Sequence, residues 1–155
     1  MATQFWLFKA EPHIYGIEHL AAAPNQIGRW DGIRNYQARN FLRDQVALND
    51  EVFIYHSSCK YVGIVGTAKI IKTAYPDPTQ FDPTSNYYDP KATREKPRWV
   101  SVDIQLTQVF PQIIPLAKIK AQPPLENMVL IKQSRLSTQP VTAAEWEFIH
   151  RELMD

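Results

Sequence analysis

The sequence predicts an α+β domain built around a small β-barrel. Segments with strand character are separated by short helices in no regular alternation, which argues against a doubly wound parallel sheet. Gly63 and Gly66 lie inside one strand-like segment, where glycine indicates a bulge or a close approach of two backbones. Residues 98–110 alternate apolar and polar side chains, as a half-buried strand does. Tight corners and half-buried strands together favour a small barrel.

The first part of the chain contains one expected strand and two expected helices. Residues 4–9 are rich in aromatic side chains and form a strand that ends at Glu11. Residues 17–23 form a short helix, which Pro24 stops. Asn35 caps the second helix, whose apolar side chains recur at helical spacing.

Two further strands and a long loop follow. The strands are expected at residues 51–57 and 62–75. Residues 75–97 form a long ordered loop that contains the pair Asp-Pro three times. Aspartate before proline is typical of turns, and this explanation outweighs a calcium or catalytic site.

The chain closes with a helix over residues 142–153. Thr142 and Glu145 have the spacing of a capping box, in which each side chain bonds the other residue's backbone. Trp146, Ile149 and Leu153 form an apolar stripe that packs this helix onto the rest of the domain.

Length and composition indicate one ordinary folded domain over residues 1–155. A chain of 155 residues falls within the roughly 100 to 200 residues expected of one domain, and 21% of its residues are charged. The net charge of +1 argues against a protein that binds long nucleic acid mainly by releasing counterions. Residues 29–135 hold 15 Lys or Arg against 10 Asp or Glu, so we expect a modest basic face opposite an acidic C-terminal helix.

The sequence favours a cytoplasmic protein without a metal. The N-terminal segment has no basic region before its apolar run, so neither a signal peptide nor a membrane span is expected. Cys59 is the only cysteine, and the four histidines show no metal-ligand spacing. No cofactor is expected, and a homodimer is compatible with the sequence but not required by it.

Four blocks carry a resemblance to a known family. They are WLFKAEP (6–12), WDGIRNYQARNFL (30–42), VFIYHSSCKYVGIVG (52–66) and RLSTQPVTAAEW (135–146). Together they resemble the EVE family, and the resemblance extends in order over nearly the whole chain. The family is similar to PUA, ASCH and YTH domains, which implies a PUA-like pseudobarrel with flanking short helices and a C-terminal helix.

The resemblance implies a non-catalytic module that binds nucleic acid. The implied partner is DNA or RNA with a modified base, such as a methylated cytosine, that is flipped into a pocket. Two positions depart from the family pattern, since members often have Ser where this chain has Ala10 and Val where it has Thr138. If either position contributes to the pocket, the ligand preference differs while the fold does not.

A pocket for an extruded base needs an aromatic ring to stack on and polar groups that read the base edge. We expect Trp30 to stack on the base, although a role in the core is the competing explanation. Polar groups that bond the base edge are expected at the ends of the predicted elements. These residues are Asn35, His56, Ser57, Ser58, Ser137 and Gln139.

Cationic side chains near the same blocks are expected to contact phosphate groups. Arg135 is the principal one, because it stands beside Ser137 and Gln139. Arg34, Arg39 and Lys60 are further expected contacts, while Lys9 and Glu11 are expected to pair at the edge of the cleft.

The alternative function is an enzyme or accessory subunit that acts in RNA or nucleotide modification. Cys59 lies three residues after His56, but no third group that would orient such a pair is identifiable. The motifs of α/β-hydrolases, P-loop proteins, zinc proteases and deaminases are absent from the sequence. A binding module is therefore favoured.

Overall fold

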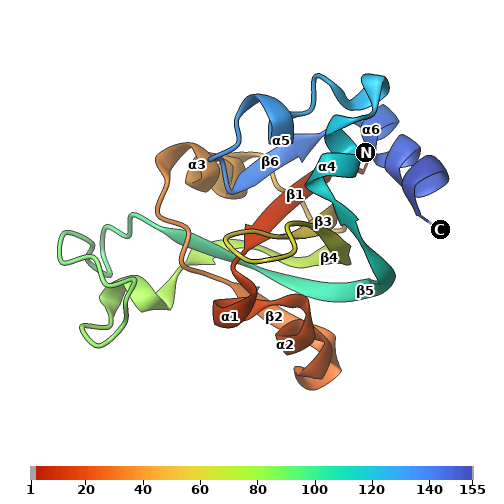
Figure 1. Ribbon diagram of the computed structural model, residues 1–155. Helices are drawn as coiled ribbons and strands as arrows, with labels where there is room; N and C mark the ends of the chain where they lie inside the picture. Colours follow the sequence, from red (N-terminus) through yellow and green to blue (C-terminus); the bar gives the residue numbers. More distant parts are fainter. Residues whose placement is uncertain (1–2, 155) are drawn as a thin grey trace.

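A computed structural model, which describes residues 3–154, contains one mixed sheet of six strands in the order β2-β5-β4-β3-β1-β6 (Figure 1). The parallel pair is β1 with β3, and the other neighbours are antiparallel. The strands are β1 (Phe5–Ala10), β2 (Ile27–Trp30), β3 (Glu51–His56), β4 (Gly63–Pro76), β5 (Val100–Pro115) and β6 (Thr138–Val141).

Short helices flank this sheet on both sides. They are α1 (Pro12–Tyr15), α2 (Ile17–Ala22), α3 (Tyr36–Asp44), α4 (Leu116–Lys120), α5 (Val129–Lys132) and α6 (Ala143–Phe148). Single 3₁₀ turns occur at Pro24–Gln26, Pro78–Phe81 and Pro123–Leu125, and a π-helical segment at Ile149–Leu153 continues α6. Within residues 3–154, no helix combines the length and the apolar character needed to cross a bilayer.

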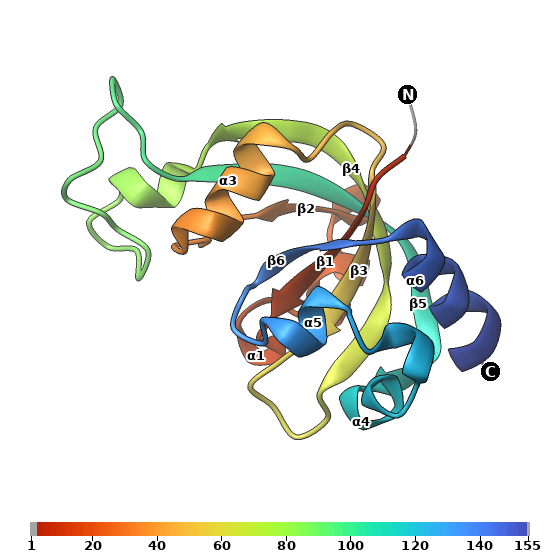
Figure 2. The same cartoon turned by 90° about the horizontal axis from the view of Figure 1, so that it is seen from above.

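The long strands β4 and β5 curl the sheet toward a barrel (Figure 2). Their register shifts at several points, and the glycines stand where the two backbones come closest. A Cβ atom on Gly63 would lie 2.2 Å from the carbonyl oxygen of Ile114, and one on Gly66 would lie 2.3 Å from that of Gln108. The predicted close approach is therefore confirmed. In the described residues, the edge strands β2 and β6 share no ladder, so the curled sheet remains open there.

The sheet is buried on both faces. Trp6 and Phe8 of β1 belong to one cluster of apolar side chains, while Leu7 between them belongs to a second cluster on the opposite face. The closing helix covers the second cluster, where the Trp146 ring stacks on Phe53 with ring centroids 4.0 Å apart. The predicted α+β class is confirmed, and so is the capping box of Thr142 and Glu145.

The long loop between β4 and β5 projects from one end of the sheet (Figure 2). Each aspartate of its Asp-Pro pairs accepts a hydrogen bond from the backbone N–H two residues later, which confirms the predicted turns. Asp77 is completely buried and also bonds outside the loop, which connects the loop to the segment before α3.

Candidate functional site

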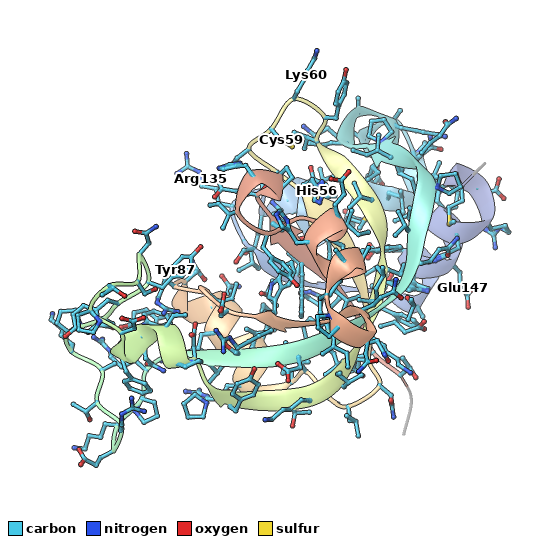
Figure 3. The ribbon with its side chains drawn as sticks, turned by 90° about the horizontal axis from the view of Figure 1, so that it is seen from below. His56, Cys59, Lys60, Tyr87, Arg135 and Glu147 are labelled. Carbon is cyan, nitrogen blue, oxygen red and sulfur yellow. The ribbon has the colours of Figure 1, made fainter. Side chains whose placement is uncertain are left out.

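One cleft has a volume of about 540 Å³, which lies within the range of ligand sites. Segments that are distant in the sequence form its walls. They are residues 9–11, Ile14 and Tyr15 of α1, residues 30–35, Ser57 and Ser58 after β3, Tyr87 of the long loop, and Ser134, Arg135 and Ser137 before β6. Figure 3 shows Arg135 and Tyr87, two of these lining residues, on different segments of the chain.

Most of the predicted site residues lie in this cleft. Those that line it are Lys9, Glu11, Trp30, Arg34, Asn35, Ser57, Ser58, Arg135 and Ser137. The predicted residues that do not line it are Arg39, His56, Lys60 and Gln139.

Asn35 and the serines provide neutral hydrogen-bonding groups. The side-chain oxygen of Asn35 accepts the backbone N–H of Ala38 at 2.9 Å and so caps α3, while its amide donates to no acceptor in residues 3–154. Ser57, Ser58 and Ser137 use no side-chain hydroxyl in a hydrogen bond with the rest of the described chain. These groups can therefore bond the edge of a ligand.

Trp30 belongs to the core more than to the cleft surface. Its side chain is only 6% exposed, and its ring lies 5.6 Å from Phe8 and 6.2 Å from Tyr15 between centroids. Little of the Trp30 ring is exposed, yet the residue lines the cleft, so stacking of a base on it stays a prediction.

Arg34 lines the cleft but is held by the protein itself. Its guanidinium donates to the carboxylate of Asp77 at 3.0 Å and to Thr79. It also donates to the backbone oxygens of Ile33 and, twice, of Tyr87. All five N–H donors are then used, so the expected phosphate contact is not available. Arg34 fastens the long loop to the cleft wall.

The carboxyl group of Asp77 is ionised by its surroundings. Burial opposes ionisation, but hydrogen bonds from Thr79, from the backbone of Gly32 and from Arg34 outweigh it and lower the pKa of Asp77. The buried carboxylate therefore remains available to Arg34 down to acidic pH.

His56 and Gln139 were expected in the pocket, and the structure places both elsewhere. The Nε2 atom of His56 accepts the backbone N–H of Ile17 at 3.1 Å, and burial lowers the pKa of this imidazole. Gln139 is completely buried, and its amide donates to the backbone oxygen of Leu136 at 2.7 Å. Both side chains support the backbone of neighbouring segments.

The remaining two expected phosphate contacts also lie outside the cleft. Arg39 is on α3, where its guanidinium carbon lies 4.8 Å from the centre of the Tyr36 ring. Lys60 lies over the Tyr61 ring at 5.3 Å, in the loop that leaves β3 (Figure 3). These two cations therefore do not line the cleft together with Arg135.

Lys9 contacts the turn before β6 instead of the expected partner Glu11. Its ammonium group donates to the backbone oxygen of Ser134 and lies 5.6 Å from the centre of the Tyr55 ring. Partial burial lowers the pKa of Lys9. This contact joins β1 to the turn that carries Arg135.

Tyr15 and Tyr87 line the cleft and were missed by the sequence reasoning. The Tyr87 ring lies against Gly32, where an added Cβ atom would be 2.7 Å from the ring. Gly32 has a φ of +78°, a conformation that favours glycine. An aromatic pair at Tyr87 and Tyr88 inside a polar loop is the signal that could have identified this side chain.

The chemistry of the cleft suits a polar, planar ligand. Arg135 and Lys9 carry positive charge, Glu11 and Asp31 carry negative charge, and the serines are neutral donors and acceptors. Across the described residues, no three His, Cys, Asp or Glu side chains gather as metal ligands would. Ala10 lines the cleft, so its departure from the family pattern falls on the site, whereas the departure at Thr138 is buried outside it.

Comparison with protein families matches the chain to the model of the EVE domain over residues 4–152. Among characterised sequences, human thymocyte nuclear protein 1 is 45% identical, and the match covers 95% of this chain and 72% of that protein. The corresponding protein of the mouse is 44% identical over the same shares.

Solved structures of similar proteins share the fold over almost the whole chain. A hypothetical protein from Leishmania major has a TM-score of 0.92 at 41% identity and covers 97% of this chain and 94% of its own. A protein from Pseudomonas syringae has a TM-score of 0.89 at 50% identity, with 94% and 97% covered. The human THYN1 protein, solved in complex with DNA containing 5-methylcytosine, has a TM-score of 0.90 at 44% identity and covers 95% of each chain.

Proposed function

The chain belongs to the EVE domain family, and we propose that its cleft binds a modified base in nucleic acid, with 5-methylcytosine in DNA as the favoured ligand. The observation that carries this proposal is the similar human protein, which was solved with DNA containing 5-methylcytosine. The cleft of this chain supports it, because neutral hydrogen-bonding groups and aromatic rings meet there beside Arg135.

In the proposed complex, a flipped base enters the cleft and lies against Tyr87. The serines and the free amide of Asn35 bond its polar edge, and Arg135 contacts a neighbouring phosphate. Aromatic stacking supplies roughly 1–3 kcal/mol per base, whereas burying one methyl group supplies about 0.8 kcal/mol. The methyl group alone then gives about a fourfold preference, so easier flipping of the modified base must add to the discrimination.

We further propose that the module is not catalytic. The Sγ atom of Cys59 donates to the backbone oxygen of Tyr61, and neither Cys59 nor His56 lines the cleft. The Nε2 atom of His56 already accepts a backbone N–H, so it offers no lone pair to a nucleophile. These contacts favour a binding role over the alternative of a nucleotide-modifying enzyme.

A binding panel tests the proposed function. Oligonucleotides that contain 5-methylcytosine or plain cytosine, in DNA and in RNA, are titrated against the protein and followed by fluorescence anisotropy. We expect the methylated DNA to bind most tightly. Equal binding of all four oligonucleotides would overturn the proposed recognition of a modified base, and a preference for the RNA would reassign the partner.

Replacing Tyr87 by alanine tests its proposed stacking role. The change removes the ring from the cleft and keeps the backbone oxygen that holds Arg34, so we expect binding to weaken by roughly 1–3 kcal/mol. Tyr88→Ala is the matched control, because the neighbouring Tyr88 is 41% exposed and does not line the cleft. Unchanged affinity in Tyr87→Ala would assign stacking to another ring.

A further inference from the structure

An exposed aromatic side chain with an arginine beside it lies directly next to the cleft. Tyr36, which follows Asn35, is 48% exposed and stacks on the buried ring of Trp99 at 4.9 Å between centroids. The guanidinium of Arg34 lies over both the Trp99 ring, at 5.3 Å, and the Tyr87 ring, at 5.5 Å. A row of stacked groups therefore runs from the cleft wall to Tyr36.

The outer face of the Tyr36 ring is not covered by Arg39. The guanidinium carbon of Arg39 lies 4.8 Å from the Tyr36 centroid and 5.8 Å from the Trp99 centroid. Trp99 stacks on one face of the Tyr36 ring, the inner face, and the outer face is the one on the other side. A guanidinium on the outer face would lie much farther from Trp99 than 5.8 Å. Arg39 therefore lies beside both rings. Arg98 lies 5.9 Å from the Tyr36 centroid and donates to the Tyr36 hydroxyl, which places it at the hydroxyl edge of the ring. Neither arginine stacks on the outer face, which stays open to a flat partner.

Arg39 also retains unused hydrogen-bonding capacity. Its N–H groups donate to the backbone oxygen of Arg98 and twice to the side chain of Asn40, which leaves two donors. Throughout residues 3–154, no carboxylate forms an ion pair with Arg39, whereas Arg98 lies 3.5 Å from Asp89. Of the two arginines beside Tyr36, Arg39 is therefore the one whose positive charge can pair with an anion of a ligand.

We propose that Tyr36 and Arg39 form a second nucleotide subsite, which receives the base next to the one in the cleft together with its phosphate. This inference rests on the proposed function of the cleft. An aromatic platform with a neighbouring cation is the usual arrangement for binding an unpaired strand. The protein then binds a single-stranded segment more tightly than it binds the modified nucleoside alone.

The test compares one nucleoside with two oligonucleotides. The probes are 5-methyldeoxycytidine, a short single-stranded DNA with one 5-methylcytosine, and the same DNA with abasic sites on both sides of that base. Tyr36→Ala should weaken binding of the intact oligonucleotide by about fivefold or more and leave binding of the nucleoside unchanged. The abasic sites should weaken binding to the unaltered protein by a similar factor. They should not weaken binding to Tyr36→Ala any further.

Matched variants separate stacking from effects on folding. Tyr36→Phe keeps the ring and removes only the hydroxyl that accepts a hydrogen bond from Arg98, so it should retain most of the binding. Tyr36→Leu keeps apolar contact with Trp99 and should behave as Tyr36→Ala. Tyr61→Ala is the control for an exposed tyrosine beside a cation, because Tyr61 is 68% exposed and lies under Lys60 outside the cleft. Melting temperatures of all variants verify that they are folded.

The arginine is tested by the salt dependence of binding. Arg39→Ala should lower the slope of log affinity against log salt by about 0.7, the value for one phosphate contact on a single strand. Arg43→Ala, on the same helix but paired with Asp44, should leave the slope unchanged.

Two results would overturn the subsite. One is a folded Tyr36→Ala variant that binds the intact oligonucleotide as tightly as the unaltered protein. The other is an equal loss for the nucleoside and the oligonucleotide, which would place Tyr36 in support of the cleft. If the unaltered protein binds none of the three probes, the proposed function itself fails, and that outcome is distinct from a failure of Tyr36 alone.

Discussion

The contacts of a single buried carboxylate determine the shape of the cleft wall. Asp77 and Asp82 each accept hydrogen bonds from the backbone and the hydroxyl of the threonine two residues later. Asp77 alone also accepts the backbone N–H of Gly32 at 2.9 Å and pairs with Arg34. The same local motif is thus a surface turn at Asp82 and a connection between distant segments at Asp77.

Asp77→Asn should lower the free energy of unfolding by about 1–3 kcal/mol at neutral pH, because a buried hydrogen-bonded charge pair loses its anion. Chemical denaturation measures this change. Asp82→Asn is the control, since it alters the same turn motif at an exposed position, and its effect should be clearly smaller. Equal effects of the two variants would show that Arg34 contributes nothing through Asp77.

The stability contributed by Asp77 should disappear in acid. Its pKa is lower in the folded protein than the ordinary value of 3.8, so the folded state favours the ionised form. The contribution is complete above that ordinary value and is lost as the pH falls through the lower, folded pKa. The difference in unfolding free energy between the unaltered protein and Asp77→Asn should therefore shrink as the pH falls below 3.8. A difference that is independent of pH would contradict the prediction.

At the scale of elements, the long pair β4 and β5 curls the sheet so that its ends approach each other. Glycine permits this because the carbonyl oxygens of β5 occupy the space in which a side chain would begin. Register shifts between the two strands add local bends where the pairing is interrupted. The curvature places the ends of β1, β2 and β3 around one cleft.

Gly63→Ala should destabilise the protein by about 1–3 kcal/mol, because the new Cβ atom meets the backbone of Ile114 and Pro115, which cannot move alone. Thermal and chemical denaturation measure this loss. Gly16→Ala is the control, since its nearest contact is 3.0 Å, to Pro12, and its effect should be smaller. A Gly63→Ala variant with unchanged stability would mean that the β4 and β5 backbones separate easily at this position.

At the scale of the whole molecule, charge is distributed unevenly in spite of a net charge of only +1. Arg135 stands at the cleft, while Glu147 of α6 lies at the opposite end of the protein (Figure 3). The cleft itself holds Glu11 and Asp31 beside Lys9 and Arg135. Under the proposed function, we therefore expect few phosphate contacts and a shallow salt dependence of binding.

Arg135→Ala should reduce the salt dependence of DNA binding by about 0.7–0.9 in slope, as expected for the loss of one phosphate contact. Titrations at several salt concentrations provide the measurement. Arg151→Ala is the control, because Arg151 is exposed in the last helical segment and lies next to Glu152. Loss of affinity without a change in slope would assign Arg135 to base recognition.

The sequence by itself determined the features that depend on residues close together in the chain. The caps at Asn35 and Thr142, the turns at the Asp-Pro pairs and the close approach at Gly63 all followed from short patterns, and the structure confirms them. Such patterns work because their hydrogen bonds and steric limits involve neighbours within a few residues. The order of predicted strands and short helices indicated the α+β class, and the resemblance to the EVE family, which the family comparison confirms, added the PUA-like pseudobarrel.

The tertiary structure alone decided which polar side chains reach the cleft. Trp30, Arg34 and Gln139 have the residue types that suit a base pocket, yet Arg34 and the amide N–H of Gln139 bond groups inside the protein, and the Trp30 ring is largely buried. Arg34 and Asp77 are 43 residues apart, and Tyr87 of the same long loop is 53 residues from Arg34. Burial and long-range pairing depend on how segments pack, so no local pattern distinguishes a residue held by the protein from one that is free to bind.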